Sequence, residues 1–119
     1  MDDGLVASGR FVRIETRGDR SGLARAVTVG FVEDPDVPGA LLVAAGSTDA
    51  AWARNLLADP RCHATAGERS FDAAAEQLAP ADHARAIREL ILRYGTPAET
   101  LGRGTSFRLR PLDPSGGAR

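Results

Sequence analysis

The chain has 119 residues, of which 43% are hydrophobic and 26% are charged, and its formal net charge is −1. This length predicts one domain, residues 1–112, and the composition excludes a disordered chain. The near-neutral charge gives no support to nucleic-acid binding, and no apolar run approaches the roughly 20 residues that a membrane span needs. The sequence shows no secretory signal, so we expect a cytoplasmic protein.

The basic residues, apart from two histidines, are all arginine, which is typical of a GC-rich, actinobacterial-like composition. Cys62 is the single cysteine and cannot form an internal disulfide. Cys62 and His63 also lack the further ligands of a zinc site, so we expect no metal.

The first third of the chain predicts three strands. Phe11–Thr16 alternates apolar and polar residues, and Arg25–Glu33 is rich in β-branched residues. Turn residues Gly18–Gly22 join these two strands into a hairpin. Ala40–Ala45 does not alternate, which is typical of a strand covered on both faces.

A short helix is expected over Ser47–Ala58, with Thr48 or Asp49 as its N-cap. Pro60 follows and ends it. A second hairpin is then predicted, with strands at 61–66 and 70–78 around a turn at 67–68, although its three consecutive alanines are weak strand formers.

A longer helix is predicted over Asp82–Tyr94, because its apolar residues recur at helical spacing and Gly95 follows as a C′ residue. A last strand is expected at Phe107–Pro111, and residues 113–119 read as a disordered tail. The elements together predict a mainly β (α+β) fold, a six-stranded antiparallel barrel with a short and a longer helix. The dinucleotide and P-loop fingerprints are both missing from the sequence.

The first hairpin carries the best candidate for an anion site. Arg20 and Arg25 stand five residues apart across a glycine-rich turn, where both guanidinium groups and turn amides could hold a phosphate or carboxylate. The alternative is a solvated hairpin tip on which Asp19 neutralises its neighbours.

Other polar or aromatic residues have two readings each. Trp52 and Asn55 lie one turn apart on the short helix, where they either serve the core and the helix surface or support a flat ligand. Tyr94 is either core or a hydroxyl that reaches a cavity. The histidines and serines show no triad spacing, and Asp72 and Glu76 predict no carboxylate pair.

Three motifs in order resemble the deazaflavin-dependent nitroreductase family. They are Gly18-Asp-Arg-Ser-Gly-Leu-Ala-Arg25, Leu41-Leu-Val-Ala-Ala45 and Trp52-Ala-Arg-Asn-Leu-Leu-Ala-Asp-Pro60. The likeness runs from about Phe11 to Pro111. It implies a split β-barrel oxidoreductase that delivers hydride from reduced coenzyme F420 to an electron-poor acceptor of the nitro, quinone or enone type.

The resemblance also implies roles for individual residues. Arg20 and Arg25 would hold the phosphate and acidic tail of F420, and Ala44 and Ala45 would present backbone groups to the deazaflavin ring. Trp52 and Asn55 would fix the helix that closes the pocket. The proton would come from Tyr94, Ser47 or water.

The loop Gly46–Ala51 departs from the family pattern, because it is shorter, contains no lysine and carries Asp49. The alternatives are therefore an FMN-binding member of the fold, or a cofactor-free relative that acts as a small-molecule-binding module, cyclase or isomerase. The expected partner is a small-molecule substrate, and the oligomeric state stays open between monomer and homodimer.

Overall fold

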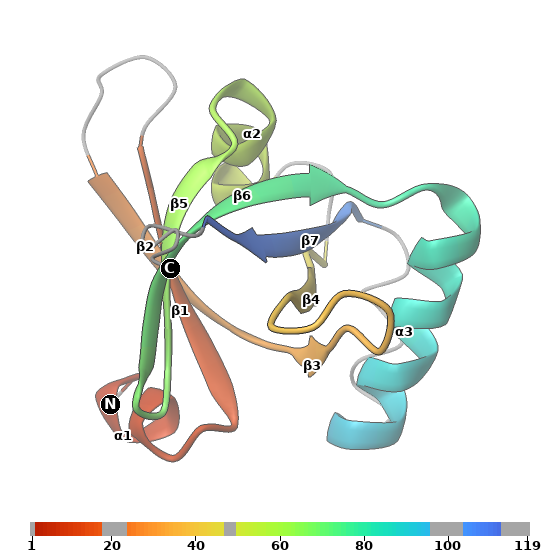
Figure 1. Cartoon of the computed structure of the whole chain (residues 1–119), viewed down its shortest axis with the longest axis horizontal. Helices are drawn as coiled ribbons and strands as arrows, with labels where there is room; N and C mark the ends of the chain where they lie inside the picture. Colours follow the sequence, from red (N-terminus) through yellow and green to blue (C-terminus); the bar gives the residue numbers. More distant parts are fainter. Residues whose placement is uncertain (1, 18–23, 47–49, 96–103, 113–119) are drawn as a thin grey trace.

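The computed structural model describes residues 2–17, 24–46, 50–95 and 104–112. They form one curled antiparallel sheet with helices around it (Figure 1). The strands are β1 (Phe11–Arg17), β2 (Ala24–Gly30), β3 (Val32–Glu33), β4 (Leu41–Ala44), β5 (Arg61–Ala66), β6 (Arg69–Gln77) and β7 (Ser106–Pro111). The helices are α1 (Asp2–Ala7), α2 (Ala51–Ala58) and α3 (Pro80–Tyr94). The mainly β fold with a short and a longer helix is confirmed, while the predicted six strands are corrected to seven.

The seventh strand arises because the predicted strand 25–33 is divided in two. β2 pairs with β1, whereas β3 pairs with β4, and Phe31 lies between them. The chain thus changes its partner strand at one residue, which is a tertiary event that the local pattern of apolar residues does not reveal. The first helix, α1, was also not predicted.

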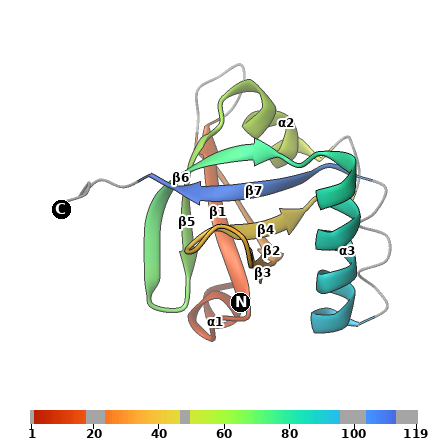
Figure 2. The same cartoon turned by 45° about the vertical axis from the view of Figure 1, so that its right-hand side comes forward.

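The strand order is β2-β1-β5-β6-β7-β4-β3. The two edge strands of this order, β2 and β3, are consecutive in the chain and are separated only by Phe31. The sheet must therefore curl until its two edges meet, which gives the half-closed barrel seen in Figures 1 and 2.

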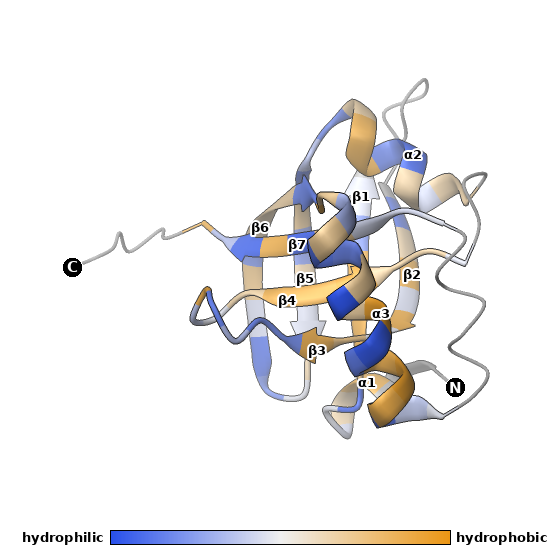
Figure 3. Cartoon of the chain, turned by 90° about the vertical axis from the view of Figure 1, so that its right-hand side faces the viewer, coloured by the Kyte–Doolittle hydropathy of each residue, from blue (hydrophilic) through white to orange (hydrophobic). Residues whose placement is uncertain are grey.

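The core lies on both sides of β4, as its apolar run predicted. Leu41 and Val43 belong to the main cluster inside the curled sheet, whereas Leu42 and Ala44 belong to a second cluster beneath α3. Figure 3 shows β4 as a hydrophobic strand passing behind α3. All four residues of β4 are buried, because α3 covers the face that the barrel interior does not.

The helices begin and end for recognisable reasons. α3 has Pro80 in its first turn and is followed by Gly95 at a φ of 96°, which confirms the predicted C-terminal end. α2 begins at Ala51 and its N-cap residue, Ala50, makes no side-chain cap. The predicted caps Thr48 and Asp49 lie outside the described residues, as does the tail 113–119.

The predicted second hairpin is confirmed as β5 and β6 around Gly67, whose φ is 61°. Its three consecutive alanines lie within β6, and Ala73 is completely buried in the main core cluster. α1 closes this end of the barrel, where the Gly67 N–H donates to the Val6 carbonyl at 2.7 Å. α2 lies at the opposite end (Figures 1 and 2).

Candidate functional site

A split in the barrel wall lies between β2 and the Ala44 end of β4. The two sheet edges meet where β3 pairs with Leu41 and Leu42, and no described strand continues this pairing beyond Leu42. β2 and β4 nevertheless stay in contact. We use "the split" for this region, which is bounded by unpaired strand edges that can hydrogen-bond a flat ligand.

Ala44 and Ala45 stand at the end of β4 beside the split. The Ala45 N–H donates to the Thr105 carbonyl at 2.8 Å, which directs the polar groups of Ala45 toward β7. In a β-strand the N–H and C=O of one residue point to the same side, and those of the next residue point to the other side. The N–H and C=O of Ala44 therefore face the split. No described strand pairs with Ala44 on that side.

Arg25 lies on the concave face of β2, at the end of the barrel near α2. It stands directly opposite Thr16, and cross-strand partners share one face of a sheet. Thr16 is only 3% exposed, and its Oγ1 accepts a hydrogen bond from Asn55 Nδ2 at 3.1 Å. Arg25 itself is exposed and forms no ion pair with a described residue.

Asn55 therefore joins α2 to β1 through a buried side-chain hydrogen bond. Trp52, one turn earlier on α2, is half-buried and packs its ring 5.9 Å from that of Phe107. The two residues hold the helix against the barrel end where Arg25 lies. The structure thus brings Arg25, Asn55 and Trp52 to one end of the molecule.

Tyr94 lies at the last turn of α3, against the junction of β2 and β3. Its hydroxyl accepts from the Phe31 N–H at 3.0 Å and donates to the Arg10 carbonyl. The ring packs so closely on β2 that a Cβ at Gly30 would lie 2.9 Å from it. Tyr94 thus contacts the backbone at the point where β2 passes into β3. Arg20 and Ser47, the remaining predicted site residues, lie outside the described residues.

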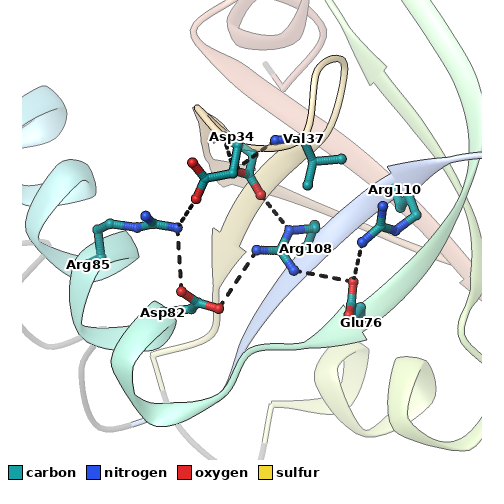
Figure 4. A network of polar contacts seen from close by, with 8 residues as sticks. Asp34, Val37, Glu76, Asp82, Arg85, Arg108 and Arg110 are labelled. Carbon is teal, nitrogen blue, oxygen red and sulfur yellow. Dashed lines mark hydrogen bonds and ion pairs between the residues drawn. The ribbon is translucent and has the colours of Figure 1, made fainter.

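A charged network beneath α3 was missed by sequence reasoning (Figure 4). Arg108 of β7 is 9% exposed and donates to Asp34, which is 5% exposed. It also lies 3.3 Å from Glu76 and 3.9 Å from Asp82. Arg110, two residues further along the same face of β7 and half-exposed, donates to Glu76 at 3.0 Å. The network joins the turn after β3 to β6, β7 and α3.

The carboxylates of this network have shifted pKa values. Burial alone would raise the pKa of Asp34, but hydrogen bonds from Arg108 and two backbone N–H groups outweigh it, and the pKa is lowered. Hydrogen bonds from Arg110 and Arg108 lower the pKa of Glu76. Both acids are therefore held in their charged form, which is the behaviour of a structural ion network.

The histidines also have partners that sequence reasoning missed. His63 lies 2.8 Å from Asp72 and 2.6 Å from Ser70, and His83 is partly buried, with its Nδ1 2.7 Å from Ser106 Oγ. The group of His63, Asp72 and Ser70 could have been predicted from the sequence, because a two-residue turn at 67–68 fixes a strand register in which His63 stands opposite Asp72. The described residues contain no cluster suited to a metal ion.

The curled sheet, whose two edges meet at β3 and part at the split, defines a split β-barrel. The family model for F420H(2)-dependent quinone reductases matches residues 6–105. The chain therefore belongs to this family, and the predicted oxidoreductase assignment is confirmed.

Solved structures agree on the fold. The chain is 20% identical to HutZ, a heme storage protein from Vibrio cholerae, over 93% of this chain and 87% of that one, with a TM-score of 0.72. It is 21% identical to an F420-H2 dependent reductase, FDR-A, over 85% and 94% of the two chains, with a TM-score of 0.69. A structure described as an F420 reductase is 17% identical over 93% of each chain, with a TM-score of 0.62. No curated protein matches the sequence.

The described residues are compatible with the cofactor that the family implies. An anionic phosphate and tail need a cation without a competing acid, which Arg25 provides among the described residues. A flat ring needs unpaired backbone groups, which Ala44 offers at the split.

None of the described helices is both long enough and apolar enough for a membrane crossing.

Proposed function

We propose that the chain is a reductase that transfers hydride from reduced F420 to an electron-poor small molecule of the nitro, quinone or enone type. The observation that carries the proposal is the split in a member of an F420H(2)-dependent family. Among the described residues, no strand pairs with Ala44 on the side of the split and no acid pairs with Arg25. When bound, the reduced deazaflavin supplies the hydride.

The residues of this chain would bind and orient rather than react. Arg25, with Arg20, would hold the phosphate and acidic tail through charge-assisted hydrogen bonds. The peptide groups of Ala44, with Ala45 anchored on β7, would fix the plane of the ring. Asn55 and Trp52 would hold α2 at the barrel end, which keeps the distance between ring and acceptor short.

Tyr94 or Ser47 would hold the proton that the reduced acceptor takes up, with water as the third source. The Tyr94 hydroxyl is already bonded to the backbone of Arg10 and Phe31, so its use as a donor requires one of these bonds to open. Tyr94→Phe tests this role, because loss of a proton donor lowers kcat while loss of a backbone bond lowers stability alone.

The binding proposal is tested by titrating the purified chain with F420 at two salt concentrations while deazaflavin fluorescence is followed. We expect binding that weakens with salt. In Arg25→Ala the affinity should fall about 10- to 100-fold, the equivalent of one charge-assisted hydrogen bond. Arg88→Ala removes an exposed arginine from α3 and serves as the matched control, with an expected affinity equal to the wild type.

Equal affinities of the Arg25 and Arg88 variants would contradict the role of Arg25. A wild-type chain that does not bind F420 would contradict the cofactor itself. FMN is titrated in parallel, because tight FMN binding would favour the flavin-dependent alternative and binding of neither would favour a cofactor-free relative. If F420 binds, its oxidation by nitro, quinone and enone acceptors identifies the substrate class, and light scattering of the same sample separates monomer from homodimer.

A further inference from the structure

A polar array covers the outer face of β1, β5 and β6, away from the split. Read across the three strands, its members form two rows: Arg13, Thr65 and Ser70, then Glu15, His63 and Asp72. The residues between the rows, Ile14 and Ala64 among them, are completely buried on the other face. The array is therefore turned outward, and the proposed reductase activity does not use it.

Within the array, His63 contacts a carboxylate with one ring nitrogen and a hydroxyl with the other. Nδ1 lies 2.8 Å from Asp72 Oδ1, and Nε2 lies 2.6 Å from Ser70 Oγ. An ionised carboxylate only accepts, so in neutral His63 the hydrogen is on Nδ1. Nε2 then has its lone pair free to accept from the Ser70 hydroxyl. The geometry thus fixes the tautomer that can take a proton from serine.

We propose that this group is a nucleophilic site in which Ser70 takes up acyl groups from small activated esters. Ser70 Oγ forms a bond to the carbonyl carbon, and its proton passes to His63 Nε2. The bond from that carbon to the leaving oxygen then breaks, and His63 returns the proton to the leaving group. Water, deprotonated by the same nitrogen, releases the acid and restores Ser70. Asp72 is a positioning residue that orients the imidazole.

The surroundings of Ser70 indicate which substrates it would accept. Ser70 and Asp72 are exposed and His63 is half-buried, so small molecules reach the group from solvent. Arg13 stands opposite Thr65, the cross-strand neighbour of Ser70, but its Nε lies 3.5 Å from Glu15 Oε2, so its charge is already met by that carboxylate. The outer face of these strands is polar around Ser70, which favours short acyl chains with good leaving groups over lipid esters.

A fluorophosphonate reagent tests the nucleophile directly, because it phosphonylates an activated serine with loss of fluoride. The full chain is treated without F420, and the modified peptide is identified by mass spectrometry. We expect the label on Ser70 and none in Ser70→Ala. Ser106 is an internal control, since it also contacts a histidine but is only 2% exposed and should stay unmodified.

The variants of the other two residues test the mechanism. His63→Ala should lower the labelling rate about 100-fold, the usual contribution of a general base. Asp72→Asn should lower it less, and Asp72→Glu should recover part of the loss, which a purely structural residue would not show. Hydrolysis of p-nitrophenyl acetate should follow the same order among the variants.

An unlabelled Ser70 in the wild type would overturn the proposal, as would equal labelling rates in wild type and His63→Ala. Thermal unfolding of each variant shows whether the fold is kept. If His63→Ala unfolds, His63→Gln replaces it, because the amide keeps the size of the side chain without acting as a base. F420 binding is measured separately on Ser70→Ala and should be unchanged, so failure of this site and failure of the reductase proposal are distinguishable.

Discussion

Arg108 and Arg25 lie in two regions of the same sheet and differ in how their charges are met. Arg108, beneath α3, is almost buried and is surrounded by Asp34, Glu76 and Asp82. Arg25, beside the split, is exposed and has no acidic partner among the described residues. The ion pairs of Arg108 hold secondary-structure elements together. The positive charge of Arg25 can instead attract an anion from solution. The surroundings of each arginine, more than its residue type, determine its role.

The covered region should respond most strongly to mutation. Arg108→Ala leaves the buried carboxylate of Asp34 without its cation, which should lower the free energy of unfolding by about 3 to 5 kcal/mol. Arg110→Ala removes the half-exposed neighbour on the same strand and should cost at most about 1 kcal/mol. Urea denaturation measures both values.

The F420 affinity of the folded fraction should be the same in both of these variants, because neither residue lies at the split. Similar losses of stability in Arg108→Ala and Arg110→Ala would show that the buried network is not what secures α3.

The contact between the two regions gives a second, smaller effect. Gly30 lies at the end of β2 and Tyr94 at the end of α3, and a Cβ on residue 30 would lie 2.9 Å from the Tyr94 ring. Gly30→Ala should therefore cost roughly 1 to 3 kcal/mol through overpacking. Gly4→Ala, where nothing lies within 4 Å of the new Cβ, should be neutral or stabilising and provides the control.

Thermal or urea unfolding measures these changes, and the double variant Gly30→Ala/Tyr94→Leu shows their origin. Removal of the ring should make the cost of the alanine smaller than in the wild-type background. Strictly additive costs would contradict the close contact between α3 and β2.

The smallest effect is a dependence of stability on pH. The pKa of Asp34 is lowered in the fold, so its contribution is complete above the unfolded value of about 3.9 and is lost as the pH falls through the folded value. In Arg108→Ala burial remains while the cation is gone, so the pKa of Asp34 should rise instead. The difference in stability between wild type and variant should then narrow on acidification from about pH 6 to about pH 3. Urea denaturation at each pH measures this difference in the free energy of unfolding. A difference that stayed constant with pH would contradict the ion pair between Arg108 and Asp34 as its source.

The parts of the fold set by local patterns were predictable from the sequence. The alternation in Phe11–Thr16, the double-sided burial of β4 and the end of α3 at Gly95 all follow from residue spacing. The division of the predicted strand 25–33 at Phe31 does not follow from residue spacing, because it depends on β2 pairing with β1 and β3 pairing with β4. The turn at 67–68 contained the register that places His63 opposite Asp72, although the sequence alone did not suggest that these residues act together.

The candidate site was predictable only in part, for the same reason. Its residues came from short motifs, but the pairing of Thr16 with Asn55 links β1 to α2 across 39 residues of sequence. The buried charge of Arg108 was hidden in a strand that reads as alternating apolar and basic residues. Partners for such charges are supplied by distant turns and helices, and no local pattern identifies them.

The position of β7 in the sheet has a consequence for how the protein is made. β7 is the last of the described strands along the chain but lies between β6 and β4, so it joins the β2-β1-β5-β6 part of the sheet to the β4-β3 part. Until residues 106–111 have been synthesised, both parts expose an unpaired strand edge. Such long-range pairing is slow, and open edges favour aggregation. A nascent chain that stalls after α3 should therefore need chaperone protection, and a truncation before Ser106 should yield insoluble protein instead of a smaller folded domain.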